Sequence, residues 1–83
     1  MITKYDIGDI FIRHYNGLDH ICILTSCEYD YTREEYIWNS TMLPIGTSGL
    51  MGGYSTMFLD KDLDNLGKIG NVIQLDCLME RKP

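Results

Sequence analysis

The dipeptide Asn16-Gly17 constrains the fold of this 83-residue chain more than any other feature of its sequence. Both residue types tolerate the positive φ angles that a two-residue type I′ hairpin turn requires. Segments rich in β-forming residues flank the dipeptide, at residues 10–15 and 18–27. Alternation along the first segment predicts two faces, formed by Ile10, Ile12 and His14 and by Phe11, Arg13 and Tyr15. The sequence therefore predicts a hairpin, with a buried centre at residues 21–24 of its second strand.

Three further segments have the composition of strands, and they span residues 36–42, 54–59 and 71–79. Pro44 is expected to end the first of them, since proline cannot donate a ladder hydrogen bond. Residues 60–67 predict one short helical turn. Asp60 is a suitable N-cap for this turn, and Gly67 is suited to the left-handed C′ position that follows it.

Five short strands and one helical turn before the last strand predict a mainly β fold. This order favours a small five-stranded SH3-like barrel, because closing the sheet removes exposed strand edges. A strongly twisted antiparallel sheet with the same strands is the alternative. The length fits one domain over residues 1–83, and a chain this short buries only about 60–65% of its unfolded surface. A homodimer would bury more of this surface, so a dimeric state remains one of the expected possibilities.

The charge balance restricts the partners that this chain can bind. Seven Lys and Arg face twelve Asp and Glu, which gives a net charge of −5. Proteins that bind nucleic acids or anionic membranes need basic surface, so both interactions are disfavoured. An acidic surface suits a basic partner, including a protein that itself binds nucleic acid. Maintaining solubility is the alternative role of this charge.

Two features of the sequence suggest a cytoplasmic protein. Residues 1–6 lack the basic stretch and apolar run of a signal peptide, and no apolar run is long enough to span a bilayer. The odd number of cysteines, Cys22, Cys27 and Cys77, fits reduced thiols better than a disulfide framework.

Neither a metal site nor a catalytic centre is expected. Zinc sites use closely spaced pairs of ligands, whereas Cys22 and Cys27 are five residues apart in one strand and should point to opposite faces. No local motif brings a Ser or Cys nucleophile beside His14 or His20. Neighbouring acids such as those at residues 60, 62 and 64 usually form a solvated face. We therefore expect a protein without enzymatic activity or cofactor.

The segment before the third strand has the most suggestive surface composition. Tyrosine supplies a large contact area at low entropic cost and is enriched at interface hot spots. Residues 28–35 are expected to form a long hairpin tip in which tyrosines alternate with carboxylates. The candidate partner-binding residues are Tyr29, Asp30, Tyr31, Glu34, Glu35 and Tyr36. The alternative is that some of these tyrosines fold back over the end of the sheet.

A glycine-rich loop is the second candidate site. Successive glycines allow backbone N–H groups to point at an anion, as in phosphate-binding loops. The candidate ligand-binding residues are Gly46, Thr47, Ser48, Gly49, Gly52 and Gly53. The loop lacks the lysine of a P-loop and leads into a strand, so a simple connection is the competing interpretation. A small-molecule or nucleotide-signal binder acting as an oligomer is the alternative function that this loop supports.

The Gly8-Asp9 strand start, the Asn16-Gly17 hairpin and the leucine-bearing segment 60–70 together resemble small accessory proteins of bacteriophages with SH3-like barrels. The resemblance implies a phage or mobile-element origin and a setting in the cytoplasm of a bacterial host, and it carries over no functional residues. Many small acidic phage proteins inhibit a host defence or regulatory protein, as anti-CRISPR and anti-restriction proteins do. The resemblance thus implies an inhibitor that binds a host protein, with a virion structural or assembly component as a further alternative.

Overall fold

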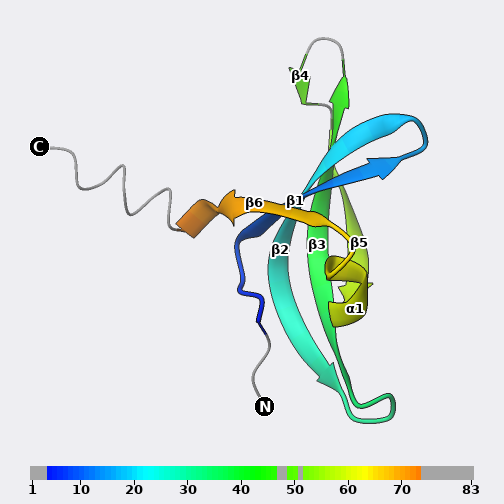
Figure 1. Ribbon diagram of the computed structural model, residues 1–83, viewed down its shortest axis with the longest axis vertical. Coiled ribbons are helices and arrows are strands. Elements are labelled where there is room, and N and C mark those ends of the chain that lie inside the picture. The colour runs from blue at the N-terminus through cyan, green and yellow to red at the C-terminus, as the bar shows by residue number, and fades with distance from the viewer. Residues whose placement is uncertain (1–3, 47–48, 51, 74–83) are drawn as a thin grey trace, which may run out of the picture.

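The computed structural model describes residues 4–46, 49–50 and 52–73, which form strands and one short helix (Figure 1). In chain order the elements are β1 (Asp9–Tyr15), β2 (Leu18–Asp30), β3 (Glu35–Gly46), β4 (Gly49–Leu50), β5 (Tyr54–Leu59), α1 (Asp60–Leu63) and β6 (Gly67–Asn71). Every strand pairing is antiparallel, and the order across the sheet is β4-β3-β2-β1-β6, with β5 also pairing with β3. The prediction of a mainly β fold with one short helical turn is confirmed.

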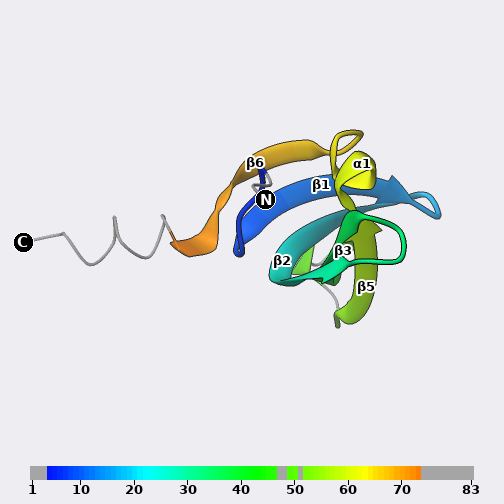
Figure 2. The same ribbon diagram turned by 90° about the horizontal axis from the view of Figure 1, so that it is seen from below.

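The described strands form an open, twisted sheet. At one edge β5 pairs only with β3, and at the other β6 pairs only with β1. Figure 2 shows the sheet curled along its length, with α1 connecting β5 to β6 across the open side. Within the described residues the curl does not close into a barrel. Of the two expected architectures, the twisted antiparallel sheet is the correct one.

The β1–β2 hairpin follows the sequence prediction. Asn16 and Gly17 have φ angles of 52° and 76°, and the flanking residues Tyr15 and Leu18 are paired across the turn. Two successive positive φ angles give the strong right-handed twist that suits a two-residue hairpin. The local chemistry of this dipeptide therefore fixes the register of the first two strands.

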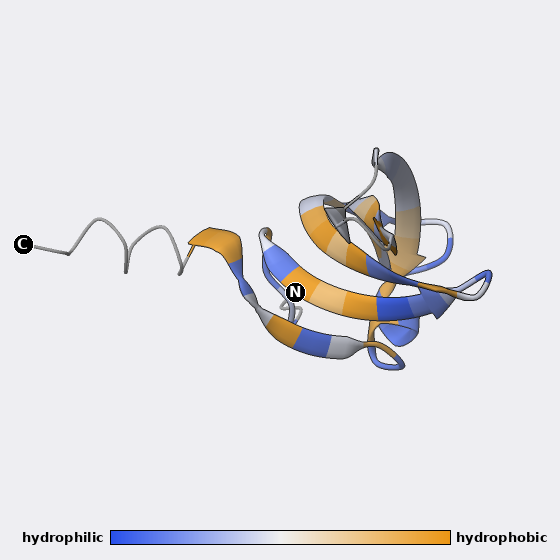
Figure 3. Ribbon diagram, turned by 90° about the horizontal axis from the view of Figure 1, so that it is seen from above, coloured by the Kyte–Doolittle hydropathy of each residue, from blue (hydrophilic) through white to orange (hydrophobic). Residues whose placement is uncertain are grey.

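The core lies on the concave face of the curled sheet. Phe11 is fully buried there, in agreement with the predicted alternation along β1. Figure 3 shows apolar residues over the central part of β1 and hydrophilic residues toward its hairpin. The buried apolar side chains come from most of the elements and are Tyr5, Phe11, Cys22, Leu24, Trp38, Met42, Phe58 and Leu63.

A β-bulge in β2 changes which side chains face the core. The β2–β3 register shifts between Leu24 and Ser26, so the alternation is reset at Thr25. As a result Cys27 packs against the same core as Cys22, and the prediction of opposite faces is wrong. Both thiols are free, and burial raises the pKa of each. Strand β2 continues past Cys27, its predicted end, to Asp30.

Strand β3 does not end before Pro44, as the sequence had suggested. It continues to Gly46, and Pro44 pairs with His20 of β2. The ladder between β3 and β5 ends at the pair Met42–Tyr54, so Pro44 lies beyond the edge of that ladder. Sheets tolerate proline at such edges, which explains the error.

Two predictions for the segment after β5 are also wrong. The N-cap of α1 is Leu59 and not Asp60, because Asp62 supplies the carboxylate that accepts the Leu59 N–H at 3.0 Å. Gly67 is not a left-handed cap but the first residue of β6. The last described strand, β6, ends at Asn71, the residue at which the predicted strand over residues 71–79 was to begin. Residues 72 and 73 are not in a strand, and residues 74–79 lie outside the described part of the chain.

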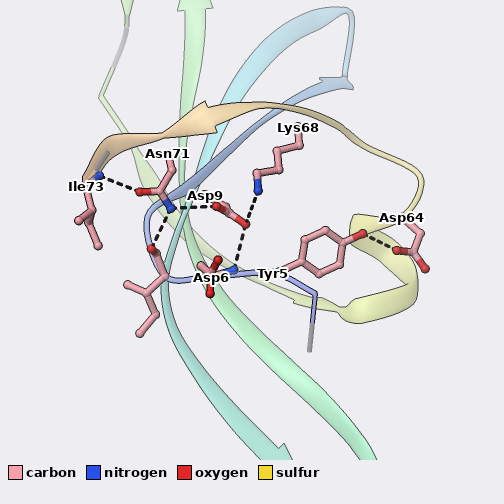
Figure 4. A network of polar contacts seen from close by, with 8 residues as sticks. Tyr5, Asp6, Asp9, Asp64, Lys68, Asn71 and Ile73 are labelled. Atoms are coloured by element: carbon pink, nitrogen blue, oxygen red, sulfur yellow. Dashed lines mark hydrogen bonds and ion pairs between the residues drawn. The ribbon is translucent and has the colours of Figure 1, made fainter. Parts of the chain in front are cut away.

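A buried polar network holds β6 against β1 (Figure 4). The Asp9 side chain is only 1% exposed and accepts hydrogen bonds from the Asp6 N–H at 2.9 Å and from Asn71 Nδ2 at 2.8 Å. Lys68 Nζ lies 3.3 Å from the same carboxylate. The Asn71 amide also donates to the Ile7 carbonyl at 3.2 Å. A buried carboxylate needs such partners, so Asp9 fixes where β6 joins the sheet.

Candidate functional site

The tip of the β2–β3 hairpin is shorter than the sequence suggested. β2 extends to Asp30 and β3 begins at Glu35, so only residues 31–34 form the turn. Asp30 Oδ1 accepts hydrogen bonds from the N–H groups of Thr32, at 2.9 Å, and Arg33, at 3.3 Å. Glu34 has a φ of 56°, in the left-handed region. The Asp30 side chain thus shapes the turn, a local role that aspartate commonly has.

Three tyrosines form a cluster at this end of the sheet. Tyr29 and Tyr36 are cross-strand partners whose ring centroids lie 5.1 Å apart at an interplanar angle of 73°. Tyr31 packs edge-on against Tyr29 at 4.9 Å and is 85% exposed. Desolvation and the negative charge of Glu34 raise the pKa of Tyr29. The cluster therefore presents neutral, donor-bearing aromatic rings beside carboxylates.

An open hollow of about 410 Å³ lies between this hairpin tip and α1. Figure 1 shows α1 beside the part of β3 that leads up from the tip. Strand and helix thus each supply one wall of the hollow, which we call the tyrosine–acid hollow. Its lining residues are Tyr29, Glu34, Glu35, Tyr36, Asp60, Lys61 and Asp64. Four carboxylates face one ammonium group, so this concave surface is strongly acidic.

The helical wall of the hollow is fixed to the core and to the N-terminal segment. Asp60 Oδ1 accepts a hydrogen bond of 2.6 Å from the indole N–H of Trp38, which is 2% exposed. Asp64 accepts the hydroxyl of Tyr5 and pairs with Lys4 Nζ at 2.7 Å. The hydrogen bonds from Lys4 and Tyr5 lower the pKa of Asp64. Both carboxylates are therefore held in place, and that of Asp64 in its charged form.

One cation of the chain already lies in the hollow. Lys61 Nζ is 3.7 Å from Glu35 Oε1, and the side chains of Lys61 and Glu35 are 69% and 32% exposed. An exposed pair at this distance is weak and readily exchanged. The site therefore accommodates an ammonium group without binding it tightly.

The structure brings most of the predicted partner-binding residues together. Tyr29, Glu34, Glu35 and Tyr36 line the hollow, whereas Asp30 and Tyr31 flank it. The sequence analysis missed the residues of the second wall, Asp60, Lys61 and Asp64. Their acids had the pattern of a solvated face, and only the contact of α1 with β3 places them opposite the tip. Trp38 was the one residue that could have pointed to this second wall, because a buried indole N–H needs a hydrogen-bond acceptor and Asp60 supplies it.

The glycine-rich loop is described only in part. Gly46 pairs with Gly49, and Thr47 and Ser48 lie outside the described residues. Gly53 packs closely against β3, because a Cβ there would come within 2.6 Å of Leu43 Cδ2, whereas Gly52 faces open space. Close packing at Gly53 fits a tight connection between strands.

A polyphosphate ligand would need several cations near the glycine-rich loop, and the described cations have other contacts. Arg33 lies 3.8 Å from Asp30, Lys61 3.7 Å from Glu35 and Lys68 3.3 Å from Asp9. Arg13 packs over the rings of Tyr15 and Phe58. These contacts place the four cations around the tip, β1 and β6, and give the loop no support as a phosphate site.

Two further observations concern the described part of the chain. It holds no group of three or more His, Cys, Asp or Glu side chains placed to bind a metal ion. It also contains no helix with the length and apolar character needed to cross a bilayer.

Comparisons of the chain with protein-family models, curated proteins and solved structures find no match. The geometry and chemistry of the tyrosine–acid hollow are therefore the basis on which a function is proposed.

Proposed function

We propose that this chain is a non-enzymatic binding protein that holds a basic segment of a partner protein in its tyrosine–acid hollow. One observation carries the proposal: two tyrosine rings and the carboxylates of two separate elements surround the same concave surface. Opposite charge across an interface speeds encounter and selects partners, and tyrosine supplies the contact area of a hot spot.

Arginine is the side chain that suits this surface best. A guanidinium group stacks on tyrosine faces and can donate two parallel hydrogen bonds to a carboxylate. The lining of the hollow contains both kinds of group, the rings of Tyr29 and Tyr36 and the carboxylates of Glu34 and Glu35. Lysine would gain the charge interaction but not the planar stacking. We therefore expect arginine-containing segments to bind more tightly than lysine-containing ones.

The resemblance to phage-encoded accessory proteins suggests which partner this is. Under this proposal the partner is a host defence or regulatory protein with a basic surface that normally contacts nucleic acid. An acidic chain bound to that surface would exclude the phosphate backbone, which depends on the same basic side chains. The net charge of −5 supports this class of partner.

Reversing the two carboxylates of the tip tests the proposal. We expect the double variant Glu34→Lys/Glu35→Lys to bind a labelled arginine-rich dodecapeptide at least 100-fold more weakly than the unchanged chain, in fluorescence anisotropy at fixed salt. Both residues are at the surface, so circular dichroism should show a retained fold. The affinity of the unchanged chain should fall as salt is added, because exposed charges are screened.

The matched control is the double variant Asp6→Lys/Asp19→Lys. It has the same net charge, −1, because each double reversal adds four charges to −5. Asp6 and Asp19 are exposed and do not line the hollow. Peptide binding should change by less than about five-fold, since only screened, long-range charge is altered. Equal losses in the two variants would refute the hollow as the binding surface.

Replacing Lys61 by glutamine is expected to strengthen binding of the same peptide by about two- to five-fold. The Lys61 ammonium group competes with the incoming cation for Glu35, and an exposed pair contributes little that must be broken. Arg33→Gln is the control, because it removes one positive charge at the tip from a residue outside the lining of the hollow. Weaker binding by the Lys61 variant would show that Lys61 does not compete with the ligand.

A further inference from the structure

Arg13 has an unusual environment among the cations of this chain. Of the described lysines and arginines, it is the one with no carboxylate within 4.0 Å. It is nevertheless partly buried, on the concave side of β1. A guanidinium group removed from water usually has an anionic partner, because desolvation of an unpaired charge is costly.

Aromatic and sulfur groups from three strands hold the Arg13 side chain in place. Its Cζ lies 4.6 Å from the ring centroid of Tyr15 in β1 and 5.3 Å from that of Phe58 in β5. Its Nη1 donates to Met42 Sδ of β3 at 3.6 Å. Rings bind the face of the guanidinium, and a thioether is a weak acceptor. The N–H groups at the edge of the guanidinium are therefore fixed in direction and short of strong acceptors.

Two hollows of the open side meet at Arg13. One, of about 330 Å³, lies between Arg13 and β5, and the other, of about 450 Å³, lies along β1 where it passes beyond β6. Asn65 and Leu66 line both of them. We call these two adjoining hollows together the Arg13 groove.

Unpaired strand edges border the Arg13 groove on both sides. In the described part of the chain, β5 has a neighbour only on its β3 side, and the pairing of β6 with β1 stops at Ile12. Edge strands carry rows of backbone donors and acceptors that another chain can complete. The groove thus offers main-chain hydrogen bonds along its border and one fixed cation at its centre.

We propose that the Arg13 groove binds an extended segment of a partner protein that carries an aspartate or glutamate. The segment would add to the free edge of β5, and its carboxylate would accept two hydrogen bonds from the guanidinium of Arg13. The Thr56 hydroxyl and the Asn65 amide border the same space and supply neutral polar contacts. A free phosphate would satisfy Arg13 but would leave the strand edges unpaired, so the geometry favours a polypeptide.

One carboxylate also lines the groove and limits how many acids the ligand can carry. Asp62 lies beside Thr56 and Asn65, and its Oδ2 accepts the Leu59 N–H. A ligand acid beside Asp62 would be repelled, whereas one opposite Arg13 would be bound. The groove therefore selects a segment with a single acid at one position, which differs from the basic segment expected at the tyrosine–acid hollow.

Panning a random heptapeptide library against the full-length chain and against Arg13→Gln tests the proposal. We expect the unchanged chain to enrich peptides with Asp or Glu at one fixed position, and Arg13→Gln to lose this enrichment. A selected peptide should bind the Arg13→Gln variant at least ten-fold more weakly than it binds the unchanged chain. A form of the peptide in which Gln replaces the acid should likewise bind the unchanged chain at least ten-fold more weakly than the selected peptide does. Arg13→Lys, which keeps the charge but not the planar fork, should bind it several-fold more weakly with the fold retained.

Amide spectra locate the bound peptide. The N–H groups of residues 54–59 should shift and exchange more slowly with solvent when the acidic peptide binds, and Glu34→Lys/Glu35→Lys should bind it normally. Normal binding of the acidic peptide by Glu34→Lys/Glu35→Lys would show that the groove and the tyrosine–acid hollow are separate sites. This result is expected whether or not the hollow binds basic segments. Absence of acidic enrichment, shifts confined to the hairpin tip, or protection of β5 by a second copy of the chain would each overturn the proposal.

Discussion

Replacing Asp9 by alanine is expected to lower the free energy of unfolding by about 3–4 kcal/mol. The 1% exposed carboxylate accepts hydrogen bonds from the Asp6 N–H and from Asn71 Nδ2, and Lys68 lies 3.3 Å away (Figure 4). Each hydrogen bond to a charged acceptor contributes about 1.5–3 kcal/mol, and the alanine variant loses two of them. Urea denaturation followed by circular dichroism measures the change.

The partners of Asp9 provide graded controls. Lys68→Gln should cost only about 1 kcal/mol, because the Lys68 side chain is 46% exposed and Asp9 keeps its two N–H donors. Asp9→Asn should fall between the two variants, since its amide oxygen can still accept one bond. Equal costs for Asp9→Ala and Lys68→Gln would mean that the ion pair, and not the hydrogen-bond network, holds β6 against β1.

The parts of the fold that the sequence predicted correctly depend on local chemistry. Asn16-Gly17 adopts its turn because both residues accept positive φ angles, whatever the rest of the chain does. Phe11 is buried because alternation in a strand is a property of the strand itself. Strands and their faces could therefore be predicted wherever the periodicity was unbroken.

Several of the wrong predictions involve a contact between distant parts of the chain. The bulge at Thr25 is a feature of the β2–β3 pairing, and it turned Cys27 toward the core. Asp60 was expected as an N-cap, but its carboxylate binds the indole of Trp38, 22 residues away. Asp9 and Asn71 determine the position of β6 across 62 residues. Patterns read along the sequence cannot contain these pairings.

One wall of the candidate site could be expected from the sequence, and the other could not. The tyrosines and acids of the tip were predicted from their composition, since Tyr29 and Glu35 are close to each other in the chain. The opposite wall was not, because Asp60 and Asp64 become part of the site only when α1 packs beside β3. The lack of a carboxylate partner at Arg13 could be seen only in the folded chain.

Replacing Trp38 by alanine is expected to lower the free energy of unfolding by about 4–5 kcal/mol. Trp38 is the largest fully buried side chain, and truncating a buried aromatic residue to alanine typically costs about 3–5 kcal/mol. The 2.6 Å hydrogen bond to the Asp60 carboxylate is lost as well. A chain of this length has a total stability of about 4–12 kcal/mol, at roughly 0.05–0.15 kcal/mol per residue. Thermal unfolding by circular dichroism should find the midpoint lowered by about 16–40 °C, at about 4–8 °C per kcal/mol for a domain of this size.

Trp38→Phe separates the packing role of Trp38 from its role at the site. Phenylalanine keeps an aromatic ring in the core but has no N–H for Asp60, so we expect a cost of about 2 kcal/mol and a folded protein at 25 °C. Asp60 forms part of the tyrosine–acid hollow, and its carboxylate would lose the 2.6 Å hydrogen bond from the indole N–H. The folded variant should therefore bind the arginine-rich dodecapeptide about three- to ten-fold more weakly, although Trp38 does not line the hollow. Unchanged affinity in a folded Trp38→Phe protein would show that the hydrogen bond from Trp38 to Asp60 does not matter for binding of the peptide.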